Sequence, residues 1–380
     1  MTTFGIARPL RLSVSGTVSA SGDVATSSVP TWASGATLNA WTEIAGTSGA
    51  GGAAVDAFSG WALVGTKVVI ACAGGHGSGH DNRVVSCDLS ANSPSWTTLM
   101  AASASGTNDA AYYSDGKPCS RHTYHSIHAI TGNKVLLGGV RFTYNGGQAF
   151  YNLDAFDLDT NTWDGVVPGS PGTSGSGYAA QSPSGAYTSA QDGDGNLWWI
   201  GSAAVAKYTV STNTWSSPSI TGAVTDNVRY PWAWDSARSQ LFGLCWADGE
   251  GSGTGLRAMR QNGTTQAAIS FNASSALTDL IADAPEYAAM GYEPTLDKFL
   301  FYEGHDTRAG RVYVITPNDT TTWDVSVLST TGTPTATFGT KAGQNYSGVQ
   351  NRFSYISFGS VAGFVMLPRA SSNLYFLRTA

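Results

Sequence analysis

The sequence predicts an all-β protein built from repeated four-stranded units. Its 380 residues include 46 glycines, 12 tryptophans, 16 tyrosines and 14 phenylalanines. Charged residues make up only 12%, about half of the share of roughly 25% in average domains. This composition is typical of many short strands joined by tight turns. Similar segments also recur at intervals of about fifty residues, which indicates a repeat architecture.

The repeat consists of six blocks, and each block predicts four strands. A strand, a tight turn, a second strand, a variable loop and a third strand lead to an Asn/Thr-rich turn and a tryptophan, as at Trp163, Trp215 and Trp323. Asn, Asp and Gly in the turns suit the left-handed conformations that hairpins require. Four-stranded blades around an axis follow, as in a β-propeller. The blocks begin near Trp61, Arg121, Gly185, Pro231, Tyr287 and Arg352.

The last block has only three strands, which predicts how the ring closes. The segment Ala40–Ile44 resembles the fourth strand of a blade, and we expect it to pair with Asn373–Arg378. A single propeller of six four-stranded blades, closed by an N-terminal strand, is the predicted fold. Seven blades are the alternative, if residues 96–120 or 265–286 contain further strands. The only helix we expect is a short one within Ala273–Ala284.

The N-terminal residues lie outside the repeat. They are rich in Ser, Thr and Gly and contain few large apolar groups. We therefore divide the chain into a flexible arm, residues 1–38, and a propeller, residues 39–380. The arm is expected either to be disordered or to become ordered on a partner.

A double glycine and an Arg-x-x-x-His-Ser pattern relate the repeat to a known family. They are Gly138-Gly139 and Arg121 with His125-Ser126 in the second block, and Gly74-Gly75 in the first. With the spaced tryptophans, these residues resemble kelch-type β-propellers over about residues 40 to 380. The resemblance implies the propeller fold, and it leaves the function open.

Charge and cysteine usage exclude several classes of function. The net charge is -6 and Lys and Arg are not clustered, which argues against a nucleic-acid partner. The chain has no run of 18 apolar residues, so we expect no membrane span, and its first residues lack the apolar core of a secretory signal. The four cysteines form no CxxC pair, so we expect no metal or other cofactor, and Cys72 and Cys87 are expected as buried free thiols. Pairing of these two cysteines is the alternative.

The candidate site begins at the stretch GGHGSGHDNR, residues 74–83. This stretch is the loop between the second and third strands of the first block, and Ser120–His122 leads into the second block. In a four-stranded blade these segments open on the same face, so we expect them to be neighbours. The candidate catalytic residues are His76, His80, Arg121, His122 and Tyr144. The candidate ligand-binding residues are Asp81, Arg83, Arg141, Arg229, Tyr230, His305, Asp306 and Arg308.

This face is expected to hold a large share of the charges, whereas the opposite face should carry short turns. Other polar motifs have a structural interpretation. His125 and His128 are expected to be packed strand residues. Asp192–Asn196 resembles part of a calcium loop but lacks the later bidentate acid, and we expect a hairpin turn there.

Three functions compete. A polar, aromatic-rich cup suits a cell-surface or extracellular glycan, and the composition with a loose arm is similar to that of phage virion proteins that touch a host surface. We therefore expect a carbohydrate-binding propeller, on a virion or extracellular, with the arm attaching to a virion or other protein. The alternative is a polysaccharide lyase like the ulvan-lyase propellers, with His and Tyr as acid and base and Arg on the uronate. A copper radical oxidase is a third reading, from Tyr124-His125, but this pair falls on an inner strand.

Overall fold

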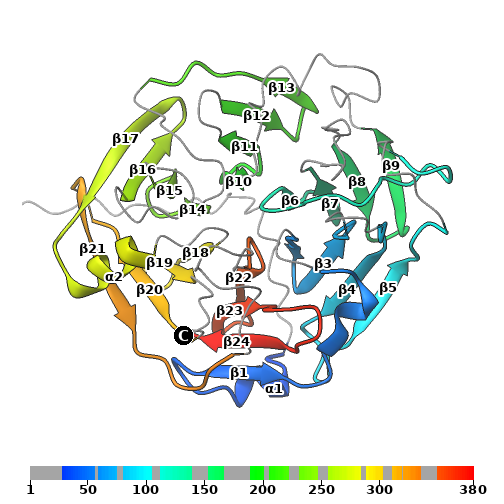
Figure 1. Cartoon of the computed structure of the whole chain (residues 1–380), viewed down its shortest axis with the longest axis horizontal. Coiled ribbons are helices and arrows are strands. Elements are labelled where there is room, and N and C mark those ends of the chain that lie inside the picture. Colours follow the sequence, from blue (N-terminus) through cyan, green and yellow to red (C-terminus); the bar gives the residue numbers. More distant parts are fainter. Residues whose placement is uncertain are drawn as a thin grey trace, which may run out of the picture.

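The strands of this computed structural model form a propeller-like ring of sheets. Figure 1 shows the sheets following one another around a centre in sequence order, with β6, β10, β14, β18 and β22 nearest to it. The structure describes residues 28–55, 59–74, 80–104, 112–138, 153–166, 189–200, 205–221, 231–246, 256–283, 288–302, 310–318, 320–334 and 349–380.

The first three sheets are four-stranded and antiparallel, with their strands in sequence order. The first contains β2 (Ala62–Val64), β3 (Lys67–Ala71), β4 (Val84–Asp88) and β5 (Trp96–Met100). The second contains β6 (Ile127–Ile130), β7 (Lys134–Leu137), β8 (Asp154–Asp157) and β9 (Thr162–Val166). The third contains β10 (Ser189–Gln191), β11 (Leu197–Ile200), β12 (Val205–Thr209) and β13 (Thr214–Ser216).

The next two repeats share one eight-stranded sheet. Each repeat forms an antiparallel half, and the outer strands of the halves pair in parallel through Ser270 with Thr322 and Phe271 with Trp323. The described residues therefore form four sheets of four strands and one of eight, and no seventh group of four. The first half contains β14 (Trp232–Asp235), β15 (Gln240–Trp246), β16 (Leu256–Asn262) and β17 (Thr265–Phe271). The second half contains β18 (Ala289–Glu293), β19 (Lys298–Tyr302), β20 (Val312–Thr316) and β21 (Thr322–Leu328).

The last sheet confirms the predicted closure of the ring. Its strands are β22 (Phe353–Ser357), β23 (Ala362–Met366), β24 (Leu374–Arg378) and, from the other end of the chain, β1 (Trp41–Ile44). β1 pairs antiparallel with β24, with Trp41 opposite Leu377 and Ile44 opposite Leu374. Because the last repeat supplies only three strands, β1 satisfies the outer edge of β24 and joins the two ends of the chain.

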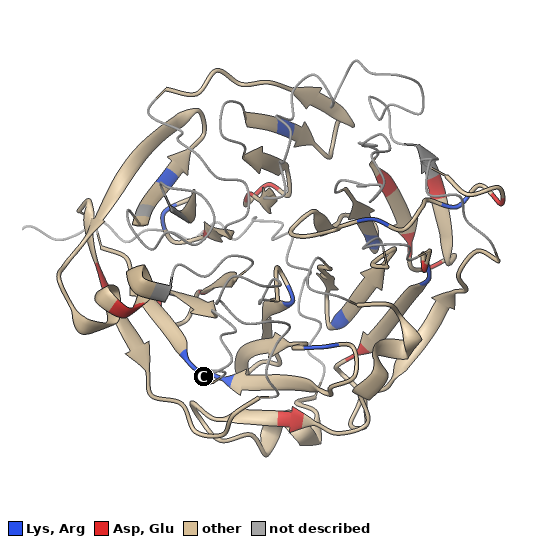
Figure 2. Ribbon diagram, viewed as in Figure 1, with Lys and Arg blue, Asp and Glu red and all other residues tan. Residues whose placement is uncertain are grey.

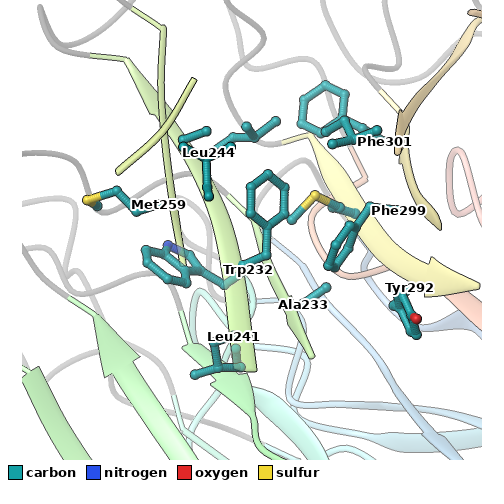
Figure 3. Close-up of a cluster of buried hydrophobic side chains, with 14 of the residues drawn as sticks. Trp232, Ala233, Leu241, Leu244, Met259, Tyr292, Phe299 and Phe301 are labelled. Carbon is teal, nitrogen blue, oxygen red and sulfur yellow. The ribbon is translucent and has the colours of Figure 1, made fainter. Parts of the chain in front are cut away.

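Aromatic side chains fill the space between the sheets. In the largest cluster, part of which Figure 3 shows, Phe242 lies 4.7 Å from Phe299 and 4.8 Å from Trp323, measured between ring centroids. All three side chains are fully buried. They come from β15, β19 and β21, so they hold the two halves of the eight-stranded sheet together.

Two edges of the ring follow from the antiparallel order. The start of each first strand, the loop between the second and third strands and the end of each fourth strand lie at one edge, which we call the loop edge. The turns between first and second and between third and fourth strands lie at the other, the turn edge.

Charged side chains are also frequent among the described residues of the turn edge, whereas many charges expected at the loop edge lie outside the described residues. Figure 2 shows the described charges scattered over the sheets rather than gathered in one patch. At the turn edge Arg238 pairs with Asp235 and with Asp297 of the next repeat, at 3.3 Å and 2.7 Å. Local turn geometry, which needs carboxylates to accept backbone N–H groups, explains many of these acids. Asp192, for example, accepts from the Asn196 N–H at 2.8 Å and closes the predicted hairpin turn.

The chain reaches β1 along the turn edge. Helix α1 (Thr31–Ser34) places Trp32 edge-on against Phe358, with ring centroids 5.5 Å apart, and the Trp32 indole N–H donates to the Ala91 carbonyl at 3.1 Å. Phe358 lies in the turn before β23 and Ala91 in the turn before β5. Residues Thr31–Ala36, assigned above to the arm, therefore pack onto the sheets, and residues 1–27 lie outside the described residues.

The predicted helix and free thiols agree with the structure, whereas α1 and a 3-10 helix were not predicted. Helix α2 (Ser275–Asp283) falls within the predicted helical segment, and a short 3-10 helix, η1 (Ser48–Gly52), follows β1. Cys72 and Cys87 are buried free thiols, as expected. Burial raises the pKa of both thiols, to about 12 for Cys87, so both are protonated at neutral pH.

Candidate functional site

The loop edge brings the first two sheets together, as predicted. The Arg121 N–H donates to the Cys72 carbonyl at 2.9 Å, and the Asn82 side-chain amide donates to the Pro118 carbonyl at 2.8 Å. These bonds join the ends of the loop after β3 to the segment that leads into β6. The residues His80–Arg83, Tyr112–His122 and Asp154 form a largely buried polar cluster, which we call the polar junction.

A small hairpin, Tyr112–Pro118, forms one wall of the polar junction. The Tyr113 N–H donates to the Lys117 carbonyl at 2.9 Å, and Asp115-Gly116 form its turn. Fully buried Asn82 anchors the hairpin, because its amide donates to the Pro118 carbonyl at 2.8 Å. The same amide also donates to the Ser103 hydroxyl at 2.9 Å. Sequence reasoning missed the hairpin, although an Asp-Gly turn signal was present at its tip.

A buried ion pair lies under the wall. Arg121 Nη2 and Asp154 Oδ2 are 3.1 Å apart, and both side chains are 2% exposed. The Tyr112 hydroxyl donates to the second carboxylate oxygen at 2.8 Å. Burial raises the pKa of Asp154 above its ordinary value, although the Arg121 guanidinium acts in the opposite direction. Arg121 is thus committed to a partner within the chain, and its role here is to hold Tyr112 and β8 in place.

Asp81 and Arg83 brace the base of the loop. Arg83 Nε lies 2.8 Å from Asp81 Oδ1, and the other Asp81 oxygen accepts the Ala54 N–H at 2.8 Å. Gly74 packs so closely on this turn that a Cβ would lie 2.8 Å from the Asp81 carbonyl oxygen. The charges of Asp81 and Arg83 are therefore paired with each other.

His80 and Tyr113 form the aromatic part of the polar junction. Their rings meet edge-on with centroids 6.4 Å apart, and the Tyr113 hydroxyl lies 3.0 Å from the Ser120 hydroxyl. His80 is partly exposed, but its Nδ1 is buried and has no hydrogen-bond partner among the described residues. The exposed part of the His80 ring is therefore what a ligand can reach, because Nδ1 itself lies out of solvent.

His122 makes a short polar contact with Tyr124. His122 Nδ1 and the Tyr124 hydroxyl are 2.8 Å apart, and the residues are 7% and 5% exposed. Tyr124 has a φ of 42°, a left-handed conformation that is rare for an aromatic residue and costs about 1–3 kcal/mol. The surrounding contacts therefore impose the position of this phenol.

Polar groups bridge the centre of the ring at the loop edge. The Asn351 amide accepts the Trp61 N–H at 2.9 Å and donates to the carbonyls of Trp61 at 2.8 Å and Ile127 at 3.1 Å. His125 Nε2 lies 3.3 Å from the Ala288 carbonyl oxygen, which belongs to the far side of the ring. These contacts join the first, second, fifth and sixth repeats with polar groups at the centre of the ring.

The other candidate residues lie outside the described part of the chain. They are His76, Arg141, Tyr144, Arg229, Tyr230, His305, Asp306 and Arg308. Tyr112, Tyr113, Asn82 and Asp154, which the sequence did not single out, belong to the polar junction. Among described residues no group of three or more His, Cys, Asp or Glu is arranged to hold a metal ion. In the same residues no helix has the length and apolar character needed to cross a membrane.

Comparisons with known proteins give only distant likenesses. No family model matches the chain, and no curated protein matches it. Among solved structures it is similar to a fungal alcohol oxidase of the AA5 family in complex with copper, with 14% identity and a TM-score of 0.45 over 84% of this chain. It spans only 61% of that oxidase.

Two further solved structures are similar over comparable lengths. YjhT has 12% identity and a TM-score of 0.44, over 88% of this chain and 94% of its own. The Malassezia sympodialis allergen Mala s 1 has 10% identity and a TM-score of 0.43, over 79% of this chain and 86% of its own. All these TM-scores are below 0.5, so these likenesses carry no argument about activity.

Proposed function

We propose that this chain is a six-bladed, kelch-like β-propeller that binds a carbohydrate at the polar junction. The two halves of the eight-stranded sheet count as two blades, because each has four antiparallel strands in sequence order. The observation that carries the binding proposal is the wall of the junction, where His80 and Tyr113 stand on a base braced by Asn82. Sugars need pre-positioned hydrogen-bonding groups, and this wall supplies them in the partly exposed His80, which buried Tyr113 holds in place.

The floor at the centre supports binding in a cup. Asn351 joins the sixth repeat to the first and second, and His125 joins the second to the fifth, so a ligand at the loop edge would rest on packed polar groups. The N-terminal segment approaches on the turn edge, where Trp32 contacts Phe358. Attachment through residues 1–27 to a virion or another extracellular assembly would therefore leave the cup open to a host or environmental glycan.

Retention of the protein on immobilised or gel-embedded glycans tests this proposal. Wild-type protein should be retarded by at least one member of a broad panel, and His80→Ala should weaken that retention several-fold. Asp194→Ala, an exposed residue of the turn edge, is the matched control and should behave as wild type. A panel with no retained member would overturn the proposal.

A polysaccharide lyase is the second candidate, and the His122–Tyr124 contact favours it. A phenol 2.8 Å from an imidazole is a pair able to exchange a proton, as β-elimination requires. The arginine that this chemistry needs on the uronate cannot be Arg121, which is paired with Asp154. Incubation with acidic polysaccharides should then produce the ultraviolet absorbance of unsaturated uronates, and His122→Ala should abolish it. If no absorbance develops, the lyase proposal is overturned and only the carbohydrate-binding proposal stands.

A further inference from the structure

The charges of the polar junction are paired one to one. Its described cations are Arg83, Lys117 and Arg121, and each lies within 3.1 Å of a carboxylate. The partners are the only described acids of the junction, namely Asp81, Asp115 and Asp154. With its histidines neutral, this surface has no net charge.

Each of the three cations also donates to a backbone carbonyl. Lys117 Nζ donates to the Ala101 carbonyl at 3.2 Å, Arg121 Nε donates to the Cys119 carbonyl at 3.3 Å, and an Arg83 amino group donates to the Gly51 carbonyl at 3.4 Å. A ligand carboxylate would therefore have to displace an acid of the protein or lose water without gaining a counter-charge. Both are unfavourable, because an unpaired carboxylate loses more hydration than it regains.

Neutral hydroxyl groups face no such cost. A hydroxyl both donates and accepts, so it can bond to exposed polar groups of the junction, such as the partly exposed His80 ring, without disturbing an ion pair. We propose that the polar junction selects an uncharged glycan over one that carries uronate or other acidic groups. This inference rests on the proposed carbohydrate binding and specifies its ligand class.

Retention on paired neutral and acidic polymers tests the selection. Mannan, soluble starch and a β-glucan represent the neutral class, and pectate and alginate the acidic class. Wild-type protein should be retained by a neutral polymer, with little change between low and high NaCl, because an uncharged ligand is not screened. Retention on acidic polymers should be absent or weaker.

A charge-releasing variant sharpens the test. Asp115→Asn removes the partner of Lys117 and should raise retention on acidic polymers about 2- to 5-fold at low salt, since a single exposed pair is worth up to about 1 kcal/mol. Neutral retention should remain. Asp164→Asn changes the net charge equally at the turn edge, with a side chain 37% exposed against 38% for Asp115, and should have no effect.

The outcomes separate this inference from the function on which it rests. Salt-sensitive preference of the wild type for pectate or alginate would overturn the selection and leave carbohydrate binding standing. An Asp115→Asn variant no different from Asp164→Asn would also overturn it, because the junction would then not sense ligand charge. Failure to be retained by any polymer would remove the proposed function itself.

Discussion

Gly60 occupies the most restricted position at the centre of the ring. Its N–H donates to the Thr123 hydroxyl at 2.7 Å, and a Cβ at this position would overlap the Tyr124 carbonyl oxygen and the Asn351 side chain. Both neighbours are held by the polar contacts that bridge the repeats. The residue is therefore required for close approach of two backbones rather than for an unusual φ.

Gly60→Ala should lower the free energy of unfolding by about 3 kcal/mol, because neither the backbone nor the bridging amide can yield. Chemical denaturation measures this loss. Gly35→Ala is the control, since its Cβ would meet only an ordinary contact at 3.5 Å, and its effect should stay within about 0.5 kcal/mol. Equal stability of the two variants would show that the centre is loosely packed.

The buried ion pair allows a second prediction at this scale. Arg121→Met leaves the Asp154 carboxylate buried with only the Tyr112 hydroxyl, so it should cost about 3–5 kcal/mol of stability. The double variant with Asp154→Leu removes both charges and should recover part of that loss. Denaturation of the two single variants and the double variant measures the coupling, and additive losses would contradict it.

Among the elements, β1 and α1 join the two ends of the chain in different ways. β1 replaces the missing fourth strand of the last repeat, whereas α1 adds Trp32 and fully buried Ala33 to an apolar cluster between the last and first repeats. Residues Thr31–Ala36, which were assigned from the sequence to the flexible arm of residues 1–38, therefore contribute to packing between the sheets.

A series of N-terminal deletions separates these contributions. Removal of residues 1–27 should leave the melting temperature nearly unchanged. Removal through residue 36 exposes the surface under Trp32 and Ala33 and should cost about 1.5–3 kcal/mol. Removal through residue 45 deletes β1 and should broaden the transition as well, because β24 becomes an open edge. Calorimetry of the three proteins tests the order, and identical transitions would disprove closure by β1.

At the scale of the whole molecule, His128 contributes to the loss of stability in acid. His128 Nε2 lies 2.7 Å from the Ser189 hydroxyl, and burial, with a smaller effect of His125, lowers the pKa of His128 to about 3. The unfolded chain returns this histidine to its ordinary pKa of about 6.5. Between these values the unfolded state binds the extra proton, so stability is lost as pH falls below 6.5.

The pH dependence of unfolding measures this effect. The wild type should lose up to about 1.4 kcal/mol per pH unit from His128 between pH 6 and 4. His128→Asn is less stable at pH 7 because it loses the bond to Ser189, but its stability should fall less steeply over that range. Parallel pH profiles of the two proteins would show that His128 is accessible to protons in the folded state.

The amino-acid sequence alone determined the local structure and the closure. The turn at Asp192–Asn196 and the strands that contain Trp163 and Trp323 depend on contacts between residues close in sequence. The local sequence pattern therefore predicts these elements. The pairing of β1 with β24 was predictable for a related reason, since a three-stranded repeat leaves one open edge and β1 has the matching pattern.

Only the tertiary structure decided which side chains share a partner. Arg121 pairs with Asp154, 33 residues away, and His80 packs on Tyr113 across a hairpin, although the sequence predicted only that their segments are neighbours. The parallel pairing of β17 with β21 and the docking of α1 were likewise not visible in the repeat. The physical reason is the separation of the contacting residues along the sequence. Sequence periodicity reflects contacts within a repeat, whereas ion pairs and edge contacts between repeats depend on the position of each segment in the folded ring.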